Sequence, residues 1–150
     1  SGEEYEEKKR EIMNEYQNGD LNGVGIDIQY YSNNNEISNN DIQTFDSLGI
    51  FLTMSFNNTV TNNNVINNKG FGICSYDSEN NSIHENNIFY NRRNAFFICS
   101  NNSWDNNYWG KEKIFPKLIL GYKFKSLFGK NVRIYLLHFD WHPAKEPFEI

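Results

Sequence analysis

The sequence predicts an all-β fold, a single-stranded right-handed parallel β-helix (a solenoid) of about four coils. Three observations predict it: an asparagine-centred motif recurs about every 23 residues, a Gly-Ile pair recurs at the same period, and the apolar residues between them alternate with polar ones. Since the 150 residues are 38% hydrophobic and 16% aromatic, we expect one folded unit rather than a disordered chain.

The asparagine motif has the form N-x-I-x-x-N-x-I, with Val or Trp in place of some isoleucines. Its copies begin at Asn35, Asn58, Asn81 and Asn102, with identical offsets of two, five and seven residues. The second signature comprises Gly25-Ile26, Gly49-Ile50, Gly72-Ile73 and, with Phe replacing Gly, Phe97-Ile98. Its spacings of 24, 23 and 25 residues fit one solenoid turn rather than a heptad or a two-helix repeat.

Asparagine is the dominant compositional feature, with 26 copies. Asn tolerates the left-handed backbone region and bonds its own backbone, so many tight turns are expected. Coils stacked ~4.8 Å apart would place identical side chains in ladders. Isoleucine ladders would then fill the interior, and asparagine ladders would bond the backbone of the turns, which explains the asparagines without a ligand.

Three segments are predicted: an N-terminal helical cap in residues 1–20, the β-helix repeats in 21–109, and a C-terminal capping extension in 110–150. Stacked repeats leave an open apolar cross-section at each end, and that surface must be covered. We expect a helix in residues 3–16 to lay Ile12 and Tyr16 against the first coil, near Val24 and Ile26.

The last coil is expected to end in an aromatic rung, Trp104 and Trp109. Left in water, this rung would drive association, so the extension should fold back over it. The sequence therefore predicts that Trp104 or Trp109 contacts apolar residues between Ile114 and Trp141.

The charge pattern limits the classes of partner that the protein is expected to bind. A net charge of −5 and the lack of any nucleic-acid-binding motif argue against a nucleic-acid partner, and no apolar run is long enough to span a membrane. Residues 110–137 nevertheless hold seven bases against Glu112 alone. The stretch 114–130 would suit contact with an anionic membrane surface, although a cap with solvated lysines explains the same pattern and is favoured.

The repeat, with Gly-Ile between its asparagines, resembles the right-handed parallel β-helix repeats of the pectate-lyase-like superfamily, especially the NosD-type and the carbohydrate-binding and sugar-hydrolase repeat proteins. Residues 101–110, NNSWDNNYWG, look like the close of many secreted archaeal and bacterial β-helices. The final FDWHPAKEPFEI is similar to tails of archaeal surface proteins. The resemblance covers residues 21–150 and implies an extracellular, cell-surface or periplasmic location. This expectation rests on the resemblance alone, because the sequence itself shows no signal peptide. Such proteins generally have more than four coils, which is consistent with this chain being the C-terminal part of a longer protein.

The resemblance implies several activities, since its members include polysaccharide lyases and hydrolases, copper-site maturation proteins and surface proteins. The enzymes need acids stacked in one outward column. Here the position two after the repeat glycine reads Asp27, Phe51, Cys74 and Cys99, a single acid without a stacked partner. We therefore expect a non-catalytic extracellular or cell-surface module, structural or binding a glycan or a surface protein, with no cofactor. A polysaccharide-active enzyme and a NosD-like accessory that handles copper or another metal ion are the alternatives.

One pair of side chains offers a candidate catalytic dyad. His84 and Asp105 occupy the same repeat position in adjacent coils, so their Cα atoms should lie ~5 Å apart. An exposed surface pair of little energetic value is the other interpretation.

The two cysteines, Cys74 and Cys99, are predicted to share one column of adjacent coils with their sulfur atoms outward. Three outcomes remain open at this stage: two free thiols, a disulfide between the coils, or a soft-metal site.

A second candidate metal site lies near the end of the chain. His138, Asp140 and His142 alternate along the sequence, so on a strand they would share one face and present two imidazoles and a carboxylate. The alternative is a capping strand that uses its other face, Phe139 and Trp141.

Overall fold

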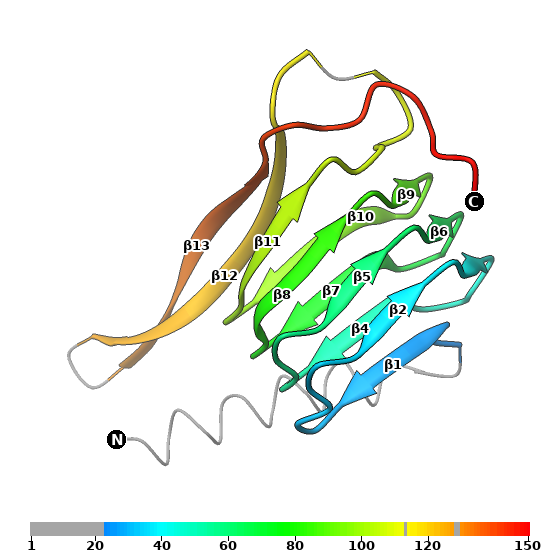
Figure 1. The fold of residues 1–150 in the computed structure, drawn as a ribbon. Coiled ribbons are helices and arrows are strands. Elements are labelled where there is room, and N and C mark those ends of the chain that lie inside the picture. Colours follow the sequence, from blue (N-terminus) through cyan, green and yellow to red (C-terminus); the bar gives the residue numbers. More distant parts are fainter. Residues whose placement is uncertain (1–22, 113, 128–129) are drawn as a thin grey trace.

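The computed structural model describes residues 23–112, 114–127 and 130–150, which form thirteen β-strands and no helix (Figure 1). Each coil contributes up to three strands. They are β1 (Ile26–Gln29), β2 (Glu36–Ser38) and β3 (Asp41–Gln43) in coil one; β4 (Ile50–Thr53), β5 (Thr59–Thr61) and β6 (Asn64–Ile66) in coil two; β7 (Phe71–Tyr76), β8 (Glu79–His84) and β9 (Asn87–Phe89) in coil three; and β10 (Arg93–Ile98) and β11 (Asn101–Asp105) in coil four. A hairpin of β12 (Lys117–Leu127) and β13 (Lys130–Asp140) follows.

Equivalent strands of successive coils pair in parallel. The pairing orders are β1-β4-β7-β10, β2-β5-β8-β11 and β3-β6-β9. The predicted parallel solenoid of about four coils is therefore confirmed. The helix expected in residues 3–16, with the contacts expected of Ile12 and Tyr16, lies outside the described residues.

The interior consists of ladders of identical or similar side chains, as predicted from the asparagine motif. Alternate residues of each short strand point inward, because successive side chains of a strand project to opposite faces. Two of these ladders are Ile37, Val60, Ile83 and Trp104, and Ile42, Val65, Ile88 and Trp109, and all eight side chains are buried.

Two asparagine ladders run along the solenoid and confirm the structural role expected for these residues. They consist of Asn35, Asn58, Asn81 and Asn102, and of Asn40, Asn63, Asn86 and Asn107. In each ladder the side-chain oxygen of one coil accepts the backbone N–H of the asparagine in the preceding coil. In coils two to four, where the ladder asparagines are buried, the turn backbone thereby gains the hydrogen bonds that water cannot supply.

A different set of asparagines forms the corners of the coils. Asn34, Asn39, Asn57, Asn62, Asn67, Asn80 and Asn106 have φ between 51° and 60°. Asn adopts this left-handed conformation at lower cost than other residues with a side chain. Adjacent asparagines thus have different structural roles. In Asn62-Asn63, Asn62 adopts the left-handed turn conformation and Asn63 forms the ladder hydrogen bonds.

The alignment predicted for coil four is wrong. Ala95, not Ile98, pairs with Ile73, so coil four follows after 22 residues and Asn94 takes the place of Gly72. Ile98 pairs with Tyr76 and belongs to an apolar cluster on the outer side of the sheet, whereas Phe97 points into the core. A turn can change length without disturbing the stacking of the strands. Residue type alone therefore matched Ile98 with Ile73, although Ala95 is the residue that pairs with it.

The sheet β4-β7-β10 is apolar on both faces. Its outer side carries a second buried cluster, which includes Phe51, Cys74, Tyr76 and Phe96. The β12 strand extends this outer cluster with Tyr122 and Phe124.

The hairpin closes the C-terminal end of the solenoid. Strand β12 pairs with β10, and β13 pairs with β11, so the two sheets of the coils are joined through the hairpin (Figure 1). Gly121 permits this approach, because a Cβ there would lie 2.3 Å from the Phe97 carbonyl oxygen. Ile119 enters the same buried cluster as Trp104 and Trp109. The expected contact between the aromatic rung and the following segment is confirmed.

Candidate functional site

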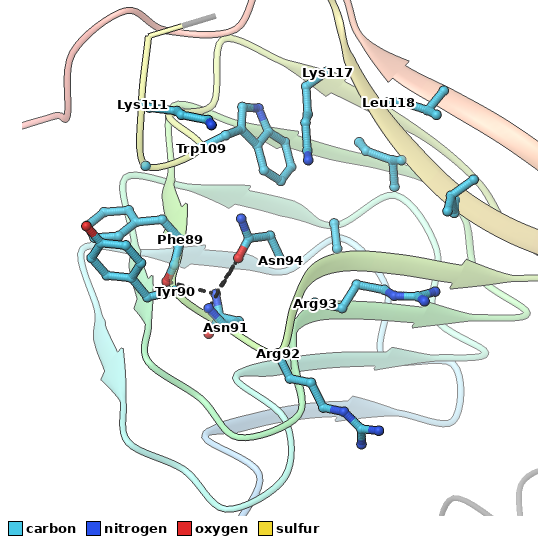
Figure 2. Close-up of a pocket in the computed structure, with 14 residues that line it drawn as sticks. Phe89, Tyr90, Asn91, Arg92, Arg93, Asn94, Trp109, Lys111, Lys117 and Leu118 are labelled. Carbon is cyan, nitrogen blue, oxygen red and sulfur yellow. Dashed lines mark hydrogen bonds between the residues drawn. The ribbon is translucent and has the colours of Figure 1, made fainter.

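Two adjoining grooves lie where coil four meets the hairpin, and they share Arg92 and Arg93. The first, here named the arginine groove, has a volume of about 500 Å³ and is lined by Phe71, Arg92, Arg93, Phe96, Tyr122, Arg133 and Tyr135. The second, the end groove, has a volume of about 560 Å³ and lies between residues 89–95, 109–111 and 117–120 (Figure 2).

A row of aromatic rings forms the floor of the arginine groove. Ring centroids lie 5.1 Å apart for Phe71 and Phe96, 5.8 Å for Phe96 and Tyr122, and 6.3 Å for Tyr122 and Tyr135. The row follows from strand stacking, because β7, β10, β12 and β13 are neighbours in one sheet and place these side chains on its outer side.

Two arginines stack on this row. The guanidinium carbon of Arg93 lies 4.8 Å from the Phe96 ring centroid, and that of Arg133 lies 4.4 Å from the Tyr122 ring centroid. A stacked guanidinium keeps its N–H donors at its edge, in the fork that matches a carboxylate, sulfate or phosphate group. The two arginines therefore present anion-binding groups over an apolar floor.

The end groove adds further cations beside aromatic rings. Figure 2 shows Phe89 and Tyr90 on one wall and Lys111 and Lys117 near Trp109. The Nζ atom of Lys117 lies 5.5 Å from the Trp109 ring centroid. On the groove floor, the Asn91 side chain donates to the Phe89 carbonyl at 3.2 Å, which fixes the turn that carries the arginines.

The grooves are electropositive although the chain is acidic. Among the described residues, no carboxylate forms an ion pair with Arg92, Arg93 or Lys111. The sequence analysis missed this site. The adjacent Arg92-Arg93 and the basic stretch 110–137 were visible signals, but only the pairing of β12 with β10 brings them together.

Comparison with known proteins agrees with this architecture. The family model described as a right-handed β-helix region matches residues 5–112. The chain belongs to this right-handed β-helix family. No curated protein and no solved structure gave a significant match. Family membership establishes the fold, since one fold carries many unrelated activities.

The structure places the proposed dyad of this β-helix in register but gives its members different partners. Asp105 pairs with His84 in the ladder as predicted. The His84 Nδ1 atom, however, lies 3.3 Å from the Thr61 hydroxyl, and the Asp105 carboxylate contacts His142 Nδ1 at 2.8 Å. Asp105 and His142 are both largely exposed, so their pair contributes little to stability.

The predicted column of Cys74 and Cys99 is wrong. Cys74 pairs with Phe96, whereas Cys99 occupies a turn position with φ 49°, equivalent to Asp77 in the coil before. The two cysteines are not joined by a disulfide. This prediction fails for the same reason as the alignment of coil four: it matched Phe97-Ile98, instead of Asn94-Ala95, with Gly72-Ile73.

Cys74 is expected to be chemically silent in the folded protein. It is fully buried, and burial raises the pKa of its thiol to about 12, so the reactive thiolate is absent at about pH 8. In a titration with a thiol-specific chromogenic reagent, Cys99→Ser should show no reacting thiol until denaturant is added. Cys74→Ser serves as the reference for Cys99, and rapid native labelling of Cys74 would contradict its burial.

The second predicted metal site is also not formed. His138 stacks on Phe97 with ring centroids 3.8 Å apart, Asp140 is fully buried, and His142 lies in solvent beside Asp105. Burial lowers the pKa of the His138 imidazole. Across residues 23–112, 114–127 and 130–150, no three His, Cys, Asp or Glu side chains cluster around a common point. Strand β13 ends at Asp140, so only His138 and Asp140 share one of its faces, and Asp140 ends the asparagine ladder.

The described part of the chain contains no helix of the length and apolar character required to cross a membrane.

Proposed function

We propose that this chain is a non-catalytic β-helix module, extracellular or at the cell surface, that binds an anionic glycan. The observation that carries the proposal is the arginine groove, in which Arg93 and Arg133 stack 4.8 and 4.4 Å above a row of aromatic rings.

The chemistry of the groove matches an acidic sugar. Aromatic rings bury the apolar C–H faces of sugar rings, while an arginine fork binds a carboxylate or sulfate through two parallel hydrogen bonds. Because the arginine groove and the end groove adjoin at Arg92 and Arg93, they offer a track for a chain of sugars rather than a closed pocket for one small molecule.

The test is calorimetric titration with oligogalacturonate, which is carboxylated, and with a heparin-derived oligosaccharide, which is sulfated. Arg93→Ala should weaken binding about tenfold, because a hydrogen bond to a charged group contributes about 1.5–3 kcal/mol. The double variant Arg93→Ala/Arg133→Ala should weaken it about 100-fold if the two contacts act independently.

Lys69→Ala is the matched control. It removes one positive charge outside both grooves, from an exposed pair with Asp46 at 2.5 Å, and should leave affinity unchanged. Binding that is insensitive to both arginines would contradict the proposal. Cleavage of the glycan by the wild-type protein would instead support the polysaccharide-active alternative, and tight copper binding would support the NosD-like one.

A further inference from the structure

The β12–β13 hairpin has an apolar face that continues the outer side of the sheet β4-β7-β10. In this antiparallel pair Leu118 lies opposite Phe139, and Leu120 lies opposite Leu137. Directly opposed residues project to the same side of a sheet. We name this set the hairpin outer face; it consists of Leu118, Leu120, Tyr135, Leu137, Phe139 and Trp141, the last of which stacks on Phe139 with centroids 4.9 Å apart.

Most of the hairpin outer face is in solvent, although the opposite face packs on the core through Ile119 and Leu136. The exposed fractions are 42% for Leu118, 43% for Leu120, 51% for Leu137, 70% for Tyr135 and 61% for Trp141. Two further apolar side chains, Ile114 and Phe115, are exposed immediately before β12. A contiguous apolar patch of this kind marks an interaction surface.

Charge identifies the class of partner. Residues 110–137 hold seven bases and one acid, a net charge of +6, which leaves seven bases against eighteen acids and a net charge of −11 in the rest of the chain. A second copy docked face to face would bring two such basic segments together. A partner that is both apolar and anionic would be attracted to this end of the molecule and repelled by the rest.

We propose that the hairpin outer face docks the protein on an anionic lipid bilayer. Its leucines and aromatic side chains enter the interfacial region, and Arg133, which lies on the same face opposite Phe124, contacts a lipid phosphate. Lys117, Lys123 and Lys125 lie on the other face of β12 and act through longer-range attraction. Tyr135 and Trp141 are suited to this depth, because their rings are apolar with one polar group.

The first test is co-sedimentation of the purified chain with vesicles. We expect binding to phosphatidylcholine vesicles that contain phosphatidylglycerol and little binding to phosphatidylcholine alone. Leu118→Ser/Leu137→Ser should weaken the binding at least about tenfold, because two half-exposed leucines no longer leave water. Leu127→Ser is the control: Leu127 is similarly exposed, at 39%, but lies on the opposite side of β12.

Trp141 supplies an internal probe of orientation. Trp104 and Trp109 are only 4% exposed, so a shift of tryptophan emission to shorter wavelength on vesicle binding would report Trp141. We expect such a shift in the wild type and its loss in Trp141→Phe, which should still sediment with the vesicles.

Three results would overturn the proposal: no preference for anionic vesicles, equal binding by the double leucine variant, or self-association in sedimentation velocity that only this variant abolishes. The last result would assign the face to a second copy. Failure here is separable from failure of the glycan proposal, since the single variant Leu137→Ser, which lies outside both grooves, should weaken vesicle binding but retain full affinity for the soluble oligosaccharides.

Discussion

Replacing Asn63 with alanine should destabilise the folded protein by about 3–5 kcal/mol. The Asn63 side chain is fully buried in the middle of its ladder. Its oxygen accepts from the Asn40 backbone N–H at 3.1 Å, and its nitrogen donates to the carbonyls of Ile37 and Thr61 at 2.8 and 2.9 Å. Alanine would leave several buried polar groups without a partner, and each such group costs about 1–3 kcal/mol.

The neighbouring Asn62 is the matched control. Its φ is 53°, and glycine adopts this region freely, so Asn62→Gly should change stability by no more than about 1 kcal/mol. Urea unfolding followed by circular dichroism measures both values, with an unchanged m-value as the check that the transition remains comparable. Equal losses at the two positions would show that turn conformation, rather than the ladder, accounts for the asparagines.

Replacing Asp140 with alanine is expected to cost about 3–5 kcal/mol as well. Asp140 is fully buried and ends the second asparagine ladder. Its Oδ2 atom accepts from the Asn107 backbone N–H at 2.9 Å, the Asn107 side chain at 3.2 Å and the Trp109 indole N–H at 3.0 Å. Thermal unfolding should show this loss of stability. Removal of the Asp140 carboxylate should also loosen the contact between the hairpin and coil four.

Two comparisons make the Asp140 result specific. Asp140→Asn should cost less than Asp140→Ala, because it keeps an oxygen that can accept from Asn107 and Trp109. Asp105→Ala removes a carboxylate from an exposed pair and should cost less than about 1 kcal/mol. If alanine at position 140 were as mild as at 105, the ladder would not depend on its final carboxylate.

The sequence also predicted part of the contact surface between the coils and the hairpin. The apolar rung of Trp104 and Trp109 implied a covering segment, because an exposed apolar cross-section is unfavourable in water, and Ile119 supplies part of that cover. The sequence did not predict that β12 and β13 would continue the two sheets of the solenoid. That pairing joins β10 to β12 across residues 99–116 and β11 to β13 across residues 106–129, and no local pattern specifies it.

Periodic residues alone determined the coils of this protein. Each position of the motif, such as Ile37, Val60 and Ile83, contacts its own equivalent about one repeat away, so a repeat in the sequence is directly a contact in space. The tertiary structure decided everything outside that periodicity: the shorter coil four that separates Cys74 from Cys99, the burial of Asp140 beneath Asn107, and the grooves in which Arg93 and Arg133 meet one row of rings. These contacts join residues that do not repeat, and they depend on turn lengths and on hairpin docking, which the packing of the whole chain sets.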